Sequence, residues 1–223
     1  CFALGCIYGP KNQYDKKSFK FDRFEPIILA NYSPDLGISL IAGLSLEKHG
    51  FRKEPYAFRD EFLVNYNLGR QSFMLTYVAK WTKAIGNNDL GIDIKSLGPH
   101  NLSNFFGIGN NTIFENKGDK EISYYRNRYD FVTANVSLSQ TNNNWKFNEG
   151  LAWQYYNSSA SNNANRFLNG YNDVNPDQNV FGTKFYTGIV AGATLDTRNK
   201  ATIPTKGILW NTTIGSYTGL SKN

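Results

Sequence analysis

Gly192-Ala-Thr-Leu-Asp-Thr-Arg-Asn-Lys-Ala-Thr-Ile-Pro-Thr-Lys-Gly207 joins two stretches in which apolar and polar residues alternate, residues 185–195 and residues 208–217. A period of two is typical of a β-strand whose two faces meet different media, one apolar and one polar. Within the joining segment, Pro204 fixes φ and removes a backbone donor where a strand begins, and Gly207 permits a tight turn. The sequence therefore predicts two strands connected through this segment.

Asp196 and Arg198 stand two residues apart in the same segment. On a strand they share a face, so their side chains are placed to pair inside the lumen of a barrel. An ordinary turn with a local ion pair would use the same residues. We therefore expect Asp196, Arg198, Pro204 and Gly207 to form an architectural motif, with no catalytic residue among them.

The same alternation recurs at fairly even spacing along most of the chain. It predicts nine or ten strands and an all-β fold, a transmembrane antiparallel up-and-down β-barrel. Residues 1–25 are an unassigned lead-in, and residues 26–223 form the barrel domain. Besides the two stretches above, the strand-like segments are residues 27–32, 38–46, 58–68, 73–81, 90–94, 132–138 and 145–155.

The connections between these segments differ in length. Short turns at one rim and long polar loops at the other are the pattern of an outer-membrane barrel, with the long loops facing outward. The short connections are residues 33–37, 69–70, 86–88 and 142–144, and the long ones are residues 48–57, 98–123 and 157–182.

Composition agrees with this fold. The chain of 223 residues is 40% apolar and contains 14 Tyr and 16 Phe, residue types that favour strands. It has no run of 18 apolar residues, but a transmembrane β-strand needs only about 9–11 residues, of which alternate ones are apolar. The net charge is +6, yet Lys and Arg are scattered, which argues against nucleic acid as a partner. Cys1 is either the first residue of a fragment, a lipidated cysteine or a partner of Cys6.

The polar faces of the predicted strands carry charged residues in mid-strand, and the apolar faces carry aromatic residues near strand ends. In a wide barrel the charges face the lumen and the aromatic residues form interfacial girdles. In a soluble β-sandwich the charges would face water and the aromatic residues would pack in a core. The charged residues are Glu47, Glu61, Lys80, Asp93 and Lys95, and the aromatic ones are Tyr66, Trp81, Trp145 and Tyr155.

Several segments resemble the barrel of the Omp85 superfamily (bacterial surface antigen), in the subgroup fused to a calcineurin-like metallophosphoesterase domain. The Asp-x-Arg…Pro-x-x-Gly pattern of residues 196–207 carries most of this resemblance. Three other segments add to it: residues 49–56 (HGFRKEPY), 104–110 (NFFGIGN) and 124–128 (YYRNR). The chain departs from the family in lacking the Arg-Gly-Phe loop after this motif and the periplasmic POTRA repeats.

The resemblance implies a barrel of about sixteen strands in the bacterial outer membrane, of which this chain is part. It also implies outer-membrane lipid as a partner, with client outer-membrane proteins and other subunits of an assembly machinery. The implied function is the insertion, assembly or translocation of outer-membrane proteins or lipids. No cofactor is implied, and the phosphoesterase domain lies outside this chain, which is not itself expected to be an enzyme.

Other chemistry is poorly supported by the residues. His49 and His100 are expected in loops, without the neighbours that a zinc site or a phospholipase dyad needs. Residues 173–184 open like a calcium loop, but Gln178 and Lys184 replace the required Gly and Glu. Two other functions remain as alternatives: a passive porin-like channel, and a soluble β-sandwich that binds a ligand through Trp and Tyr.

Overall fold

A computed structural model describes residues 20–33, 37–109, 112, 114–115 and 121–220. Cys1, Cys6 and the predicted lead-in up to residue 19 lie outside these residues. The described part of the chain forms one antiparallel sheet of nine strands in sequence order, with one short α-helix. The strands are β1 (Arg23–Ser33), β2 (Gly37–Gly50), β3 (Lys53–Asn67), β4 (Ser72–Ile85), β5 (Asn88–Asn104), β6 (Arg126–Asn142), β7 (Trp145–Ser158), β8 (Gly182–Asp196) and β9 (Leu209–Gly219).

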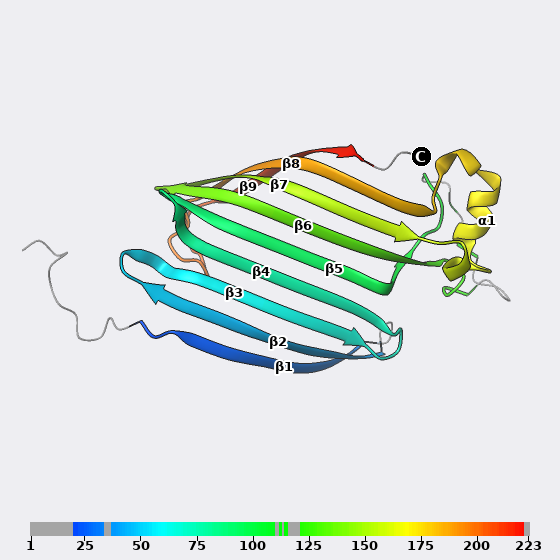
Figure 1. The fold of residues 1–223 in the computed structure, drawn as a ribbon, viewed down its shortest axis with the longest axis horizontal. Coiled ribbons are helices and arrows are strands. Elements are labelled where there is room, and N and C mark those ends of the chain that lie inside the picture. The colour runs from blue at the N-terminus through cyan, green and yellow to red at the C-terminus, as the bar shows by residue number, and fades with distance from the viewer. Residues whose placement is uncertain (1–19, 34–36, 110–111, 113, 116–120, 221–223) are drawn as a thin grey trace, which may run out of the picture.

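The all-β class and the up-and-down strand order are confirmed. Each strand pairs with the next one along the chain, and the sheet is twisted and curved (Figure 1). It is open, because β1 and β9 stand at its two edges and are not paired with each other. The strands are 11 to 17 residues long, which is at least the length that a tilted strand needs to cross a bilayer.

The two ends of the strands differ, as Figure 1 shows. The short-turn rim carries residues 51–52, 86–87 and 143–144 together with the segment 197–208. The long-loop rim carries residues 68–71, the connection between β5 and β6, and residues 159–181, which include helix α1 (Phe167–Val174) and 3₁₀ turns at Ser161–Asn163 and Pro176–Gln178. Both of the longest connections therefore lie at one rim.

Two predicted loops are wrong in part. Residues 48–57 are not a long loop, since β2 continues to Gly50 and β3 begins at Lys53 after a turn in which Arg52 has φ of 59°. Residues 98–104 belong to β5, whose pairing with β6 shifts between Leu97 and Asn101. The strands run past their apolar stretches, so their charged and Pro-containing ends resemble loops in the sequence. His49 and His100 accordingly lie in β2 and β5, not in loops.

Register places apolar side chains from all nine strands on one side of the sheet. Residues paired across neighbouring strands share a face. In one row, Leu40 of β2 is paired with Tyr66 and Tyr66 with Phe73. In another row, Leu44 is paired with Phe62 and Phe62 with Tyr77. We call this side the apolar face; further members are Ile28, Trp81, Ile92, Val136, Leu151, Ile189 and Ile214.

The opposite side, the polar face, carries Ser, Thr, Asn and charged residues. The predicted mid-strand charges all lie there, with Glu61 paired to Ser45 and Val78, and Lys95 paired to Thr76 and Thr133. The faces that the sequence predicts for β2, β4, β6 and β7 are confirmed by this register. The predicted aromatic residues Tyr66, Trp81, Trp145 and Tyr155 all lie on the apolar face.

The sheet has almost no apolar core. Among the described residues, only Ala79, Tyr125, Ala152 and Leu168 are buried and hydrophobic. By contrast, apolar-face residues are open to the surroundings, with Ile28 84% and Ile214 72% exposed. No second layer of described strands covers the apolar face. The sheet therefore exposes more contiguous apolar surface than a soluble monomer normally does.

At the long-loop rim, Asn163 attaches the segment after β7 to β6. Its side chain is fully buried. The Oδ1 atom accepts a hydrogen bond from the Arg128 backbone N–H at 2.7 Å, and Nδ2 donates to the Arg128 carbonyl at 3.0 Å and to the Ser159 carbonyl at 2.9 Å. Helix α1 follows and packs aromatic rings against the rim, with Phe167 5.3 Å from Tyr125 between ring centroids.

We expect Asn163→Ala to loosen residues 159–181 from the sheet. The substitution removes the acceptor of the Arg128 backbone N–H, at a cost of about 1–3 kcal/mol, while the Arg128 carbonyl keeps its hydrogen bond from the Ser158 hydroxyl. Limited proteolysis should cleave the variant faster within this segment than the parent protein. Asn162→Ala is the matched control, since Asn162 is exposed, and equal cleavage of both variants would contradict the role given to Asn163.

Candidate functional site

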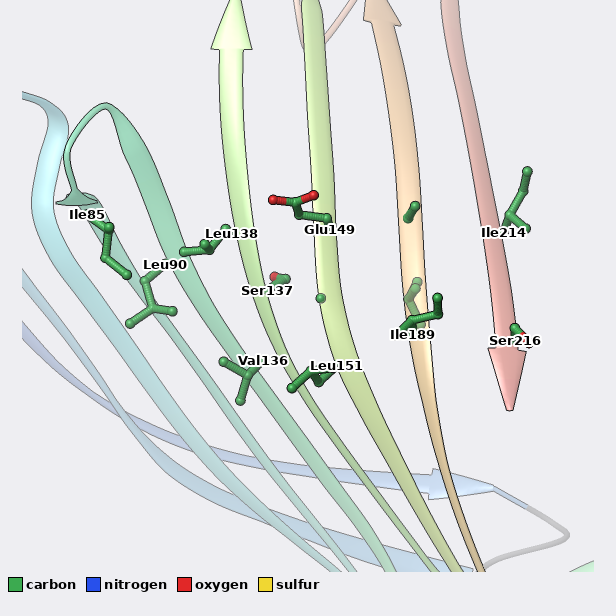
Figure 2. A pocket seen from close by; sticks show the side chains of 13 residues that line it. Ile85, Leu90, Val136, Ser137, Leu138, Glu149, Leu151, Ile189, Ile214 and Ser216 are labelled. Carbon is green, nitrogen blue, oxygen red and sulfur yellow. The ribbon is translucent and has the colours of Figure 1, made fainter. Parts of the chain in front are cut away.

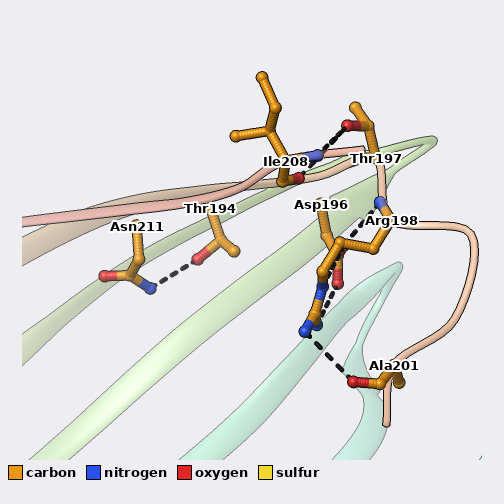
Figure 3. Close-up of polar contacts among 7 residues, drawn as sticks. All are labelled: Thr194, Asp196, Thr197, Arg198, Ala201, Ile208 and Asn211. Carbon is orange, nitrogen blue, oxygen red and sulfur yellow. Dashed lines mark hydrogen bonds and ion pairs between the residues drawn. The ribbon is translucent and has the colours of Figure 1, made fainter. Parts of the chain in front are cut away.

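The predicted ion pair is present at the end of β8. Asp196 Oδ1 accepts hydrogen bonds from Arg198 Nε at 2.9 Å and from the Arg198 backbone N–H at 3.1 Å, while Oδ2 accepts from Nη2 at 2.8 Å. Arg198 Nη1 also donates to the Ala201 carbonyl at 3.2 Å (Figure 3). Arg198 lies beyond the end of β8, so the pair shapes the turn instead of sharing a strand face.

Asn199 organises the rest of the turn. Its Oδ1 accepts hydrogen bonds from the backbone N–H groups of Thr205 at 3.1 Å and Lys206 at 3.2 Å, the two residues that follow Pro204. The Asn199 N–H in turn donates to the Lys206 carbonyl at 3.1 Å. Pro204 precedes β9 by several residues, so it lies within the turn and not at the start of the strand.

Gly207 closes the turn against Thr197. Its φ is +97°, and a Cβ atom at this position would overlap the Thr197 carbonyl group. The next residue, Ile208, donates its N–H to Thr197 Oγ1 at 2.8 Å, and its carbonyl accepts from the Thr197 N–H at 2.9 Å. Asp196, Arg198, Pro204 and Gly207 thus belong to one compact turn whose polar groups are satisfied internally, which fits an architectural role.

Arg198 lowers the pKa of Asp196 to about 2, from an ordinary value of 3.8, through side-chain and backbone hydrogen bonds to the carboxylate. As the last residue of a 15-residue strand, Asp196 lies outside the 9–11 residues that would cross a bilayer. The carboxylate therefore stays ionised at any ordinary pH. A charge so firmly held by its own turn is not suited to proton transfer.

The apolar face is hollowed where β5 to β9 run side by side. The hollow has a volume of about 660 Å³. Figure 2 shows the side chains that line it, which come from these strands and from Ile85 at the end of β4. Its lining is apolar apart from two serines and Glu149, whose side chain lies among Leu138, Leu151 and Ile189. A hollow of this size accommodates acyl chains or apolar side chains of a partner.

Asp60 and Glu149 place carboxylates among the apolar side chains of this face, and the sequence analysis identified neither. Asp60 is paired with Leu46 on one side and Ala79 on the other, and Glu149 with Leu138 and Ala191. The Asp60 Oδ1 atom is buried without a hydrogen-bond partner. The charged residues that the sequence analysis identified in mid-strand all lie on the polar face, so these two positions are exceptions. They are recognised from the strand register.

The polar face carries charges of both signs in several pairs. Lys80 Nζ lies 3.5 Å from Asp89 Oδ2, and Arg59 Nη2 lies 3.5 Å from Glu61 Oε2. His49 Nε2 lies 3.4 Å from Glu47 Oε1. Mixed, partly exposed charges are typical of a hydrated surface and form no catalytic constellation.

Other predicted features are scattered. Asp173 lies in α1 and Asp177 in the following 3₁₀ turn, and among the described residues no group of three or more His, Cys, Asp or Glu side chains is placed to hold a metal. In the same part of the chain, no helix has the length and apolarity required to span a membrane.

Comparison of the chain with protein-family models, curated proteins and solved structures gave no match.

We expect Gly207→Ala to destabilise the turn by about 1–3 kcal/mol, because the residue is held at positive φ against the Thr197 carbonyl. The denaturant midpoint of the folded protein measures the effect. Gly86→Ala is the matched control: Gly86 also has positive φ, at 61°, but nothing lies within 4 Å of its Cβ position. Equal losses in the two variants would mean that backbone conformation alone matters.

We expect the Asp196–Arg198 pair to contribute stability that disappears in acid. Because the folded-state pKa is depressed, the contribution is complete above the unfolded-state value of about 4 and is lost as pH falls through about 2. Asp196→Asn removes it at every pH. The difference in denaturation midpoint between the parent and this variant should be constant from pH 7 to 5 and shrink between pH 4 and 2; a constant difference at all pH values would contradict the assignment.

Proposed function

We propose that the chain is part of an outer-membrane β-barrel of the Omp85 type, which helps to insert or translocate outer-membrane proteins or lipids. The observation that carries the proposal is the apolar face, on which apolar side chains of nine strands lie in register, with those of β1 to β4 and β7 to β9 including many that are exposed. Lipid is the medium that covers such a face without a second layer of protein. The charged polar face then lines the lumen.

The two rims support an orientation. In outer-membrane barrels the longer loops face outward and the short turns face the periplasm. The connections at the long-loop rim, which include residues 159–181, would then be extracellular. The Asp196–Gly207 turn would lie on the periplasmic side with the turns at residues 51–52, 86–87 and 143–144.

The open edges support an assembly role. β1 and β9 present backbone N–H and C=O groups that further strands can pair with. In the proposed barrel, these edges meet the strands that complete about sixteen, and a weakly paired seam admits client strands by β-augmentation. Locally thinned bilayer beside the seam lowers the barrier to insertion. This mechanism is carried over from the family that the sequence resembles.

The test is membrane fractionation followed by reconstitution of the full-length protein. We expect it in the outer-membrane fraction, with gel mobility that changes on heating. In liposomes it should accelerate the folding of a small outer-membrane barrel added in urea. Steady conductance in planar bilayers without any effect on folding would favour the passive channel, and solubility as a monomer without detergent would favour the sandwich module.

A pair of neighbouring substitutions tests which face meets lipid. Asp60 lies on the apolar face and Glu61 on the polar face. We expect Asp60→Leu to raise the temperature at which the folded band converts to the unfolded band, because it removes an ionisable group from lipid. Glu61→Leu should lower that temperature or leave it unchanged. Stabilisation by Glu61→Leu and not by Asp60→Leu would reverse the assignment of the two faces.

A further inference from the structure

Four arginines gather at the long-loop rim around a cavity of about 250 Å³. Arg126 and Arg128 come from the first residues of β6, Arg70 from the turn between β3 and β4, and Arg166 from the segment that precedes α1. The remaining lining residues in the described part of the chain are Gly69, Gln71, Leu102 and Ser123, none of which is acidic. Asp130, two residues beyond Arg128 on the same side of β6, is the nearest acidic residue along that strand.

The cluster is held in place by hydrogen bonds from distant parts of the chain. Arg166 Nη1 donates to the Arg126 carbonyl at 2.6 Å and to the Ser123 carbonyl at 3.1 Å. Asn163 binds both backbone polar groups of Arg128. Its carbonyl also accepts the Arg166 N–H at 3.1 Å. The fold therefore fixes the Arg166 guanidinium and the backbone that carries Arg126 and Arg128.

Electrostatics favour an anion in this cavity. The pKa of Arg166 lies below its ordinary value, first because the group is partly buried and then because the charges of Arg128 and Arg126 are close. The Arg128 Nε–H is buried without an acceptor. An anion that accepts hydrogen bonds from several guanidinium groups would reduce the repulsion between these positive charges. It would also give the Arg128 Nε–H an acceptor.

Two of the four arginines, Arg126 and Arg128, lie on the same side of the sheet as the apolar face. Arg126 and Arg128 alternate along β6 with Asn127, and their positions continue the row of Val132, Ala134 and Val136. Asn127 points the other way and lines a separate cavity with Leu168 of α1 and Lys184. Arg126 and Arg128 thus lie where the apolar face meets the long-loop rim. In the proposed orientation, this is the level of the lipid head groups in the outer leaflet.

We propose that the cavity formed by Arg70, Arg126, Arg128 and Arg166 binds the phosphate of a phosphorylated lipid head group in the outer leaflet. This inference rests on the proposed membrane orientation. Guanidinium forks match phosphate oxygens with paired hydrogen bonds, and the adjoining apolar face takes the acyl chains. A soluble phosphate would use the same arginines but gain nothing from the apolar face.

Binding to the purified full-length protein in detergent micelles tests the proposal, by native mass spectrometry with three probes: bisphosphorylated lipid A, phosphatidylcholine and inorganic phosphate. We expect lipid A to bind and phosphatidylcholine to bind much more weakly. Arg128→Gln should weaken lipid A binding about tenfold or more, since it removes charge-assisted hydrogen bonds. Lys206→Gln, in the turn at the opposite rim, is the matched control and should leave binding unchanged.

Arg70→Gln provides a second variant in an exposed turn if Arg128→Gln fails to fold, with the same expected direction. Equal binding of inorganic phosphate and lipid A would overturn the lipid assignment, and equal binding of lipid A to parent and variants would overturn the site. A heat-modifiable membrane protein with no preference for lipid A defeats this inference alone. Absence from the membrane fraction defeats the proposed function.

Discussion

The structure depends on a continuous antiparallel backbone ladder that gathers the apolar side chains on one face, which no second layer of described strands covers. Two-residue turns such as residues 86–87 and 143–144 fix the register of neighbouring strands. Since side chains alternate with a period of two, a slip of one residue would move every apolar side chain of a strand to the polar face. The observed register keeps Leu40, Tyr66 and Phe73 in one row on the apolar face. The other strands are aligned in the same way. Everything proposed about function follows from the need to cover the surface that results.

Alternation was sufficient to predict the class and the two faces, because each of these depends on residues two apart. The prediction was weakest where strands extend past the apolar stretch. His49 and Gly50 carry no apolar signal, yet the backbone there continues to pair. Helix α1 was not predicted because its eight residues contain Asn, Gly and Asp, and it is stabilised by rings from elsewhere, such as Tyr125 and Phe105. Packing between distant segments overrides a weak local preference.

For the turn between Asp196 and Gly207, the sequence predicted the key residues but not the hydrogen bonds that connect them. The spacing of Asp196 and Arg198 indicated a pair, and Gly207 indicated a backbone conformation that other residues avoid. Asn199, which binds two backbone N–H groups across the turn, was missed, since Asn is common in every loop of this chain. Asn163 was missed for a stronger reason. Its main partner, Arg128, is 35 residues away, and only the folded chain brings them together.

The carboxylates of the apolar face bear on how a lipid-covered sheet would function. Asp60 and Glu149 each face an alanine on one neighbouring strand, Ala79 and Ala191, and a leucine on the other, Leu46 and Leu138. Ionisable groups at such positions weaken the contact between sheet and lipid. The arginine cluster acts in the opposite sense at the outer border, where it would hold head groups. A bilayer attached firmly at one rim and poorly matched along the strands is easier to thin, and thinning is what the insertion of another barrel requires.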